Sequence, residues 1–251
     1  MCCFTGEVND VSDTSIFARV DAAGFQYLVY QMKVDTPADV AMVLPVPVLS
    51  GWGERGLQFV DFEGYPNFFE DMDLAFPQPA SARSFSYTSA APVLGPTLAV
   101  HKVGNFIASF VPSLADFGRL DKRLQLPAGT WEKIPIYKKF GFGFAVFKLR
   151  KGRTKVHPMA LRFKSSNDTK LFFPTVHIHD GQVHAKEHFD HSLYCQGRYK
   201  ELADEWLESP VLASPTMDLE KSKGFIAGDE HLYRRKIVGV QANKDVILTW
   251  G

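Results

Sequence analysis

The sequence has few cysteines and no long apolar run, and both shortages narrow what kind of protein it encodes. Only 3 of the 251 residues are cysteine, and two of those are adjacent, so they do not make a disulfide framework. No apolar run approaches the roughly 18 residues that cross a bilayer. The start, MCCFTGEVND, lacks the basic region and apolar core of a secretory signal. We therefore expect a cytoplasmic protein with reduced thiols and no membrane partner.

The chain also lacks an excess of charge of either sign. Lys and Arg together number 28, and so do Asp and Glu, so the chain has no excess of positive charge that would indicate nucleic-acid binding. The sequence holds no phosphate-binding loop, no G-x-S-x-G elbow and no H-E-x-x-H motif, so it does not indicate the enzyme classes that use them. Phe is abundant at 21 copies, which favours an aromatic-rich core.

The order of apolar, turn and helix-forming segments predicts an α+β fold with a mostly antiparallel sheet and about four helices. Strands are expected at 14–20, 25–34, 40–48, 57–62, 98–103, 106–112, 141–149, 156–165, 171–179 and 182–189, and two more within 231–250. Helices are expected at 65–76, 114–120, 130–140 and 198–209. Because Pro45 and Pro47 cannot donate to a ladder, the third strand should lie at a sheet edge or end there.

The domain organisation follows from length and from one unusual stretch. A chain of 251 residues fits one large domain, and we expect a single domain over 1–251. Residues 77–98 are rich in Pro, Ser and Ala, which predicts a long loop or an internal linker. The sequence therefore leaves open a division into two lobes at 77–98.

A cluster of histidines is the main functional signal. Imidazole and thiolate are the ligands that zinc and copper prefer in proteins. Five of the eight histidines fall within fifteen residues, and a cysteine follows four residues later. The expected metal ligands are His177, His179, His184, His188, His191 and Cys195, with Cys3 as an additional thiolate. The sequence thus predicts a zinc or copper site, in preference to iron, and a metal ion as the first partner.

Two local conformations would gather these ligands. In one, Asp180-Gly181 forms a two-residue hairpin turn, which places His177 and His179 on one face and His184 directly opposite His177. In the other, the residues from His184 to Cys195 form a helix that carries its ligands along one stripe. The sequence does not decide between them.

An enzymatic version of this site needs a group that moves a proton. Glu187 lies among the histidines and is the expected catalytic carboxylate, with Asp190 and Tyr194 as further candidates for a metal ligand or a proton donor. The expected reaction is metal-assisted hydrolysis or redox chemistry on a small-molecule substrate.

The cysteines at the start suggest a different class of function. Removal of Met1 would leave Cys2 with a free α-amino group that could act as a base beside its own thiol. This arrangement is similar to that of cysteine amidases of the N-terminal-nucleophile class, and Arg19 and Asp21 occupy the place of that class's following strand. The asparagines that form its oxyanion hole have no match here. The resemblance implies a Cys2 amidohydrolase as an alternative.

In a third interpretation, none of these residues takes part in catalysis or in metal binding. Cys2 and Cys3 are then small buried hydrophobes, and the histidines are structural or surface groups. The chain would be a non-catalytic structural or interaction protein.

Several short strings also resemble an uncharacterised bacterial family of unknown function. Those strings are MCCF at the start, IFAR at 16–19, LPVP at 44–47, and FFPTVHIHDG followed by LYCQ. The resemblance implies no activity. It implies that the cysteines at the start and the histidine segment belong to one module.

Overall fold

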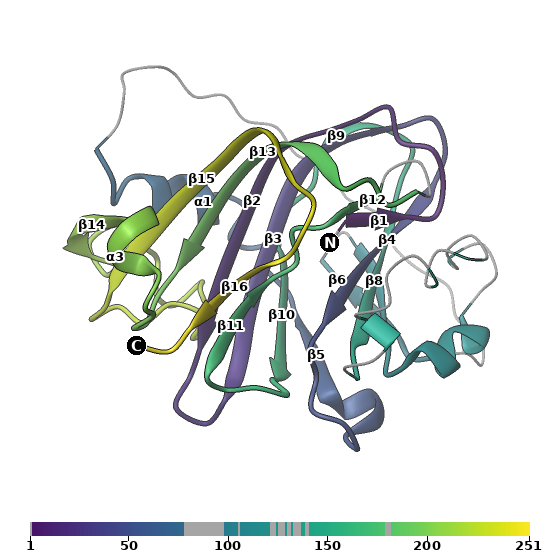
Figure 1. Cartoon of the computed structure of the whole chain (residues 1–251), viewed down its shortest axis with the longest axis horizontal. Helices are drawn as coiled ribbons and strands as arrows, with labels where there is room; N and C mark the ends of the chain where they lie inside the picture. Colours follow the sequence, from purple (N-terminus) through teal and green to yellow (C-terminus); the bar gives the residue numbers. More distant parts are fainter. Residues whose placement is uncertain are drawn as a thin grey trace.

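The computed structural model describes residues 2–77, 98–104, 106–120, 124, 129, 132, 137–138, 141–178 and 182–251 of the chain. Strands dominate this part, with two large sheets packed face to face and a small two-stranded sheet beside them (Figure 1). Its helices are short: α1 (Phe68–Asp73), α3 (Leu202–Glu205) and the 3-10 helices η1 (Gly53–Gly56) and η2 (Leu114–Arg119). The predicted α+β class with four helices is therefore wrong, and the described chain is mostly β.

The first large sheet has six strands and contains the start of the chain. Its order is β12 (His177–Ile178), β1 (Cys2–Phe4), β4 (Val40–Val46), β8 (Gly143–Leu149), β7 (Phe106–Val111) and β6 (Val100–Val103). Neighbouring strands are antiparallel except for β1 and β12, which are parallel. β4 thus lies inside the sheet, between β1 and β8, and it ends at Val46 just before Pro47.

The second large sheet has eight strands. Its order is β14 (Leu207–Leu212), β15 (His231–Ala242), β13 (Lys186–Cys195), β2 (Asp10–Val20), β3 (Phe25–Thr36), β10 (Met159–Lys164) and β5 (Leu57–Val60), with β9 (Gly152–Lys155) paired to the end of β3. β13 and β2 are parallel. The small sheet pairs β11 (Lys170–Phe173) with β16 (Val246–Thr249). The sheets are therefore mixed, which departs from the expected mostly antiparallel arrangement.

Segments from both halves of the sequence combine within each sheet. β4 pairs with β8, and β3 pairs with β10, although residues 77–98 separate these partners in the sequence. Of the stretch predicted as a loop or linker, residues 78–97 lie outside the described part of the chain. The described strands on its two sides nevertheless contribute to the same three hydrophobic clusters.

The central strands are apolar on both faces, because each sheet is covered on both sides. In β4, Met42 and Leu44 pack into the layer between the two sheets, whereas Ala41 and Val43 pack into a second layer on the outer face of the six-stranded sheet. Strands buried on both faces read as continuous apolar runs rather than as alternating ones. The run VAMVLPV of β4 has this form, and all seven of its residues are buried.

A third apolar layer covers the outer face of the eight-stranded sheet. Phe17 of β2 points into it, and Phe68 of α1 lies over Phe17 with ring centroids 5.8 Å apart. Phe62 and Tyr65 pack against Phe68 at 5.4 and 5.5 Å. Edge-to-face aromatic pairs at such distances add stabilisation beyond their buried area. The abundant Phe residues thus hold α1 on the sheet.

The structure confirms the expected helices only in part. The helix expected at 65–76 is present as α1, and that at 114–120 is the 3-10 helix η2. The segment 130–140 lies almost wholly outside the described residues. The helix expected at 198–209 is limited to the single turn of α3, because Pro210 cannot continue a helix and the chain from Leu207 pairs with β15 instead.

We predict that Gly143→Ala destabilises the protein through overpacking of the core. A Cβ at Gly143 would lie 2.6 Å from the ring of Phe110 and 2.9 Å from a methyl group of Val48. The expected loss is about 1–3 kcal/mol of unfolding free energy, measured by urea denaturation. Gly64→Ala is the matched control, because a Cβ there meets no atom within 4 Å. Equal stability of the two variants would contradict this packing.

Candidate functional site

The predicted histidine hairpin does not form, because its two strands belong to different sheets. β12, which carries His177, pairs with β1 in the six-stranded sheet, whereas β13 pairs with β15 and β2 in the eight-stranded sheet. His184 is exposed and lies before the start of β13. His179, Asp180 and Gly181 lie outside the described residues. His184 is therefore not the cross-strand partner of His177.

The residue that meets His177 is His191, which reaches it from the opposite sheet. Their Nε2 atoms lie 2.9 Å apart, and the two side chains are 3% and 1% exposed. Phe189 packs against both rings, with centroids 4.6 Å from His177 and 5.1 Å from His191. In a neutral pair one Nε2 donates a hydrogen bond and the other accepts it. This histidine pair is a buried polar bridge between the two sheets.

Two side chains after β15 fix the position of β12. The amide of Asn243 accepts a hydrogen bond from the backbone N–H of His177 at 2.8 Å and donates to its carbonyl oxygen at 2.9 Å. The carboxylate of Asp245 accepts hydrogen bonds from the backbone N–H groups of Thr175 at 2.9 Å and Val176 at 3.0 Å. It also accepts one from the hydroxyl of Tyr137. These contacts hold β12 beside the N-terminal strand β1.

The pairing of β12 with β1 brings the start of the chain to the histidine pair. The two strands are parallel, with Cys2 opposite His177 and Cys3 opposite Ile178. β1, which carries the cysteines, and β12, which carries the first histidine of the cluster, therefore lie side by side. The expectation that the cysteines and the histidine segment form one module agrees with this arrangement of the backbone.

The structure does not support a zinc or copper site. Structural zinc takes four protein ligands and catalytic zinc takes three. Among the residues that the structure describes, no group of three or more His, Cys, Asp or Glu side chains could hold a metal ion. The histidine pair brings two ring nitrogens together, and the described residues add no third ligand to it.

The alternative helical stripe is also wrong, because residues 186–195 form the strand β13. Side chains alternate between the two faces of a strand. His188 is exposed on the outer face opposite Val240, whereas His191 is buried on the inner face opposite Ile237. Cys195 shares the inner face with His191, but four residues of extended chain separate them by about 13 Å. The stripe of ligands is thus split between two sides of the sheet.

Cys3 and Cys195 are both completely buried. Burial raises the pKa of the Cys195 thiol well above its ordinary value, because the apolar surroundings disfavour the thiolate. A metal ligand or nucleophile needs the thiolate form. Cys195 therefore acts as a small apolar core residue, as does Cys3 in the outer layer of the six-stranded sheet.

The acidic and phenolic groups proposed for catalysis lie apart from one another. Glu187 is half-buried on β13 opposite Gln241. Asp190 accepts a hydrogen bond from the backbone N–H of Asp13, and burial raises the pKa of its carboxyl group. Tyr194 donates to Asp73 at 2.7 Å on the outer face of the sheet. The structure assigns none of them to a common site.

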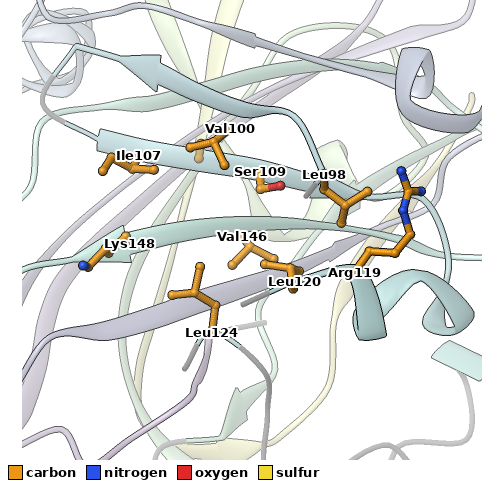
Figure 2. Close-up of a pocket in the computed structure, with 10 residues that line it drawn as sticks. Leu98, Val100, Ile107, Ser109, Arg119, Leu120, Leu124, Val146 and Lys148 are labelled. Atoms are coloured by element: carbon orange, nitrogen blue, oxygen red, sulfur yellow. The ribbon is translucent and has the colours of Figure 1, made fainter. Parts of the chain in front are cut away.

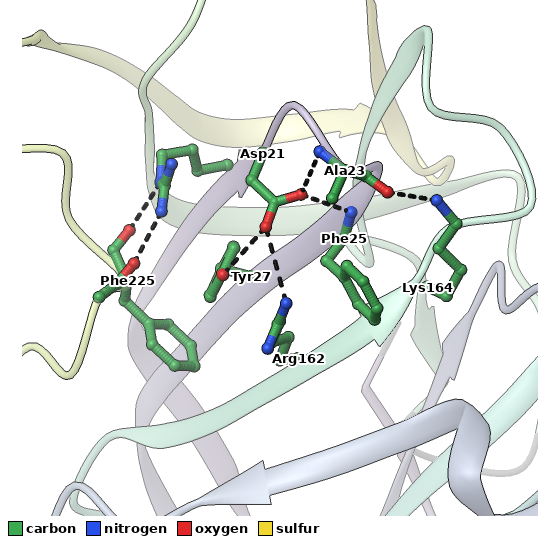
Figure 3. Close-up of polar contacts among 9 residues, drawn as sticks. Asp21, Ala23, Phe25, Tyr27, Arg162, Lys164 and Phe225 are labelled. Carbon is green, nitrogen blue, oxygen red and sulfur yellow. Dashed lines mark hydrogen bonds and ion pairs between the residues drawn. The ribbon is translucent and has the colours of Figure 1, made fainter.

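Asp21 holds the β2–β3 turn (Figure 3), and Arg19 binds the chain at residues 224–225. Asp21 accepts hydrogen bonds from the backbone N–H groups of Ala23 and Phe25 at 3.0 and 2.9 Å, and from the hydroxyl of Tyr27 at 3.1 Å. Arg19 donates to the carbonyl oxygens of Phe225 and Gly224. Both residues belong to the eight-stranded sheet, whereas Cys2 belongs to the six-stranded one.

These hydrogen bonds show that Arg19 and Asp21 stabilise the fold. The amidohydrolase interpretation of Cys2 stays a prediction, because its side chain lies outside what the structure describes.

A small hollow lies over the outer face of β6, β7 and β8 (Figure 2). Its lining residues are Leu98, Val100, Ile107, Ala108, Ser109, Arg119, Leu120, Leu124, Val146 and Lys148. Its two cationic residues are already paired: Arg119 with Glu54 and Asp116, and Lys148 with Asp39 at 3.4 Å. The hollow therefore offers an apolar surface without a free charged group of its own.

Sequence reasoning missed the residues that matter most for this arrangement. Asn243 and Asp245 occupy the connection between β15 and β16, where Asn and Asp usually indicate only a turn. Their side chains bind the backbone of residues 175–177, about seventy positions earlier. A polar pair in a turn next to apolar strands was the available signal, but its partner could not be read from the sequence.

Several solved structures are similar to this two-sheet β architecture. The chain is similar to the crystal structure of baculovirus P35, with 14% identity, a TM-score of 0.50 and coverage of 99% of both chains. It also matches mutated P35 after caspase cleavage (14% identity, TM-score 0.49, 96% and 100% covered) and P35 in the caspase-8 complex (13%, 0.45, 95% and 96%). At this identity the likeness to P35 shows the fold alone.

Sequence comparisons add no family. No family model matches the chain, and no curated protein matches it. The resemblance to an uncharacterised bacterial family stays a prediction. No helix among the described residues is long and apolar enough to cross a membrane.

We predict that His177 and His191 stabilise the fold as a coupled pair. His177→Ala, His191→Ala and the double variant form a double-mutant cycle, with an expected coupling energy of about 1–2 kcal/mol in urea unfolding. His188→Ala is the control from the same strand, because its exposed side chain should change stability little. Strictly additive losses from the two single variants would argue against the bridge.

We also predict that Cys195 resists alkylation in the native protein. At pH 8 the buried residue stays a thiol, whereas unfolding returns its pKa to the ordinary value and exposes it. Iodoacetamide labelling followed by peptide mass spectrometry should mark Cys195 only after denaturation. Rapid native labelling would contradict the burial.

The raised pKa of Cys195 should also lower the free energy of unfolding as pH rises above about 8.5, since the unfolded thiol then loses its proton and the folded one does not.

Proposed function

We propose that this chain is a non-catalytic protein-binding protein whose partner is a proteinase of the caspase class. The observation that carries the proposal is the likeness to P35, which extends over 99% of both chains at a TM-score of 0.50. P35 is the protein found in a complex with caspase-8 and in a caspase-cleaved form. The likeness extends over nearly the whole of both chains and is not limited to one segment.

The roles of the candidate chemical groups support an interaction protein. The Nε2 atoms of His177 and His191 contact each other in the core, and Cys195 is a buried thiol with a raised pKa. Arg19 and Asp21 bind carbonyl and amide groups of the backbone. These four polar residues therefore stabilise the fold.

The scaffold offers a fixed outer surface for a partner. Asp73, at the end of α1, accepts from Tyr194 at 2.7 Å and pairs with Arg234 at 2.9 Å, and the Arg234 guanidinium lies 4.5 Å from the centre of the Phe76 ring. Burial raises the pKa of Tyr194, so its hydroxyl keeps the proton that it donates. α1 is thus locked to β13 and β15. A surface that is ordered before binding loses little conformational entropy on association.

We predict that the folded chain inhibits caspase-8 at stoichiometric amounts. Recombinant chain is titrated against caspase-8 with a fluorogenic peptide substrate, and an inhibition constant of about 1 μM or tighter is expected for an interface of standard size. Size-exclusion chromatography checks for a stable complex, and intact mass shows whether the chain is cut in it.

Three controls make this test specific. Heat-denatured chain should not inhibit if the folded surface is required, and a serine proteinase should keep its full activity. His188→Ala, an exposed change on a sheet face, should inhibit like the parent. The absence of both inhibition and complex formation at excess folded chain would refute the proposal for caspase-8.

A further inference from the structure

The second half of β15 is an open edge of the eight-stranded sheet. Along its outer edge, away from β13, β15 is paired with β14 only over its own residues His231 to Arg234. Along its opposite edge β15 is paired with β13 from Tyr233 to Ala242. In the described part of the chain no strand pairs with the outer side of residues 236–242. Figure 1 shows β15 running on beyond β14 at this side of the sheet.

The register shows which backbone groups of this edge point outward. The N–H of Asn243 donates to the carbonyl oxygen of Ala185 on the β13 side. In an antiparallel pair the groups that face one neighbour belong to alternate residues. Odd-numbered residues of β15 therefore bond to β13, and Lys236, Val238, Val240 and Ala242 direct their N–H and C=O groups outward. The N–H of Leu232, another even-numbered residue, donates to the side chain of Ser209 on the β14 side, which agrees with this parity. Two of the outward carbonyl oxygens accept a hydrogen bond within the chain: that of Val238 from the side chain of Gln241 at 3.2 Å, and that of Ala242 from the N–H of Lys244 at 3.0 Å.

The side chains of the open edge include the two most exposed large apolar residues in the described chain. Val238 and Val240 are 63% and 67% exposed, and they lie on the same face opposite Asp190 and His188. Backbone groups that face no neighbouring strand, next to exposed valines, form a template for another strand. The charge in this run is limited to Lys236 at its beginning.

We propose that this edge, residues 236–242, pairs with the same edge of a second copy of this chain. A two-fold axis at Gly239 places Val238 opposite Val240 of the other copy and Lys236 opposite Ala242. Within residues 236–242 no like charges then oppose each other, and Arg234, which would face Lys244 of the other copy just beyond this run, is already paired with Asp73. An axis one residue further along, at Val240, would place Lys236 against Lys244. The interface is isologous, as a two-fold dimer requires.

Such pairing satisfies the outward groups and covers the valines. Four antiparallel residue pairs would form up to about eight main-chain hydrogen bonds between the copies, once the carbonyl oxygens of Val238 and Ala242 exchange their present donors for N–H groups of the other copy. The four valines would meet as two cross-strand pairs on one face, and β-branched cross-strand pairs stabilise sheets. The two eight-stranded sheets become one continuous sheet. This inference does not rest on the proposed binding of a proteinase.

The first test measures the oligomeric state of the full chain. Sedimentation velocity over a concentration series should show a reversible monomer–dimer equilibrium. Hydrogen exchange supplies the residue-level readout: amides of Val238, Val240 and Ala242 should gain protection as concentration rises. Amides of Ile237 and Gln241, which bond to β13, should be protected at all concentrations. A monomer over the whole series, with no change at the even positions, overturns the proposal.

Two variants locate the interface. Val240→Pro removes an outward N–H but leaves the β13 ladder intact, and Pro is tolerated on edge strands. Loss of two symmetry-related hydrogen bonds should raise the dimer dissociation constant about thirtyfold. Val238→Lys/Val240→Lys places like charges across the axis and should leave only monomer. Unfolding curves confirm that each variant is folded.

The matched control is Val211→Lys, an exposed valine on β14 that lies outside the open edge and is 40% exposed. It should dimerise like the parent chain. A dimer that persists in both edge variants, or that Val211→Lys disrupts equally, overturns the proposed interface.

Discussion

The packing of two sheets through strands that are apolar on both faces is the constraint on which this structure depends. β4 and β8 send alternate residues into the layer between the sheets and into the outer layer of the six-stranded sheet. β2 and β3 do the same with the layer under α1. Because three apolar layers share these strands, a change at one position strains two layers at once. The tight approach of Gly143 to Phe110 shows how little space remains.

The polar groups of the core are placed where the two sheets must be held in register. The histidine pair links β12 to β13 across the sandwich, and Asn243 and Asp245 clamp the backbone of the segment that contains β12. Buried polar groups are tolerated only when they are paired, and their pairing fixes one arrangement among the many that apolar packing allows. The two histidines are therefore structural residues that link the two sheets.

The same principle explains why residue type alone pointed toward metal chemistry. A dense set of histidines and a nearby cysteine matches the ligand preferences of zinc and copper. Ligands bind one ion only when they converge within about 2 Å of it, and convergence is a property of tertiary structure. Here His188 and His191 lie on opposite faces of β13, and His184 is exposed before the strand begins. Composition therefore identified an unusual segment and misjudged its role.

The sequence by itself determined most of the strands. Local alternation and turn residues are short-range signals, so β2, β3, β7 and β8 and the hairpin of β6 and β7 could be predicted. Aromatic spacing also located α1. Only the tertiary structure decided which strands became neighbours, because hydrogen bonds between strands join residues far apart in the chain. It placed β1 beside β12, made β13 parallel to β2, and turned the end of the expected helix at 198–209 into β14. Long-range pairing of this kind is fixed by the burial of whole faces, and no local pattern records it.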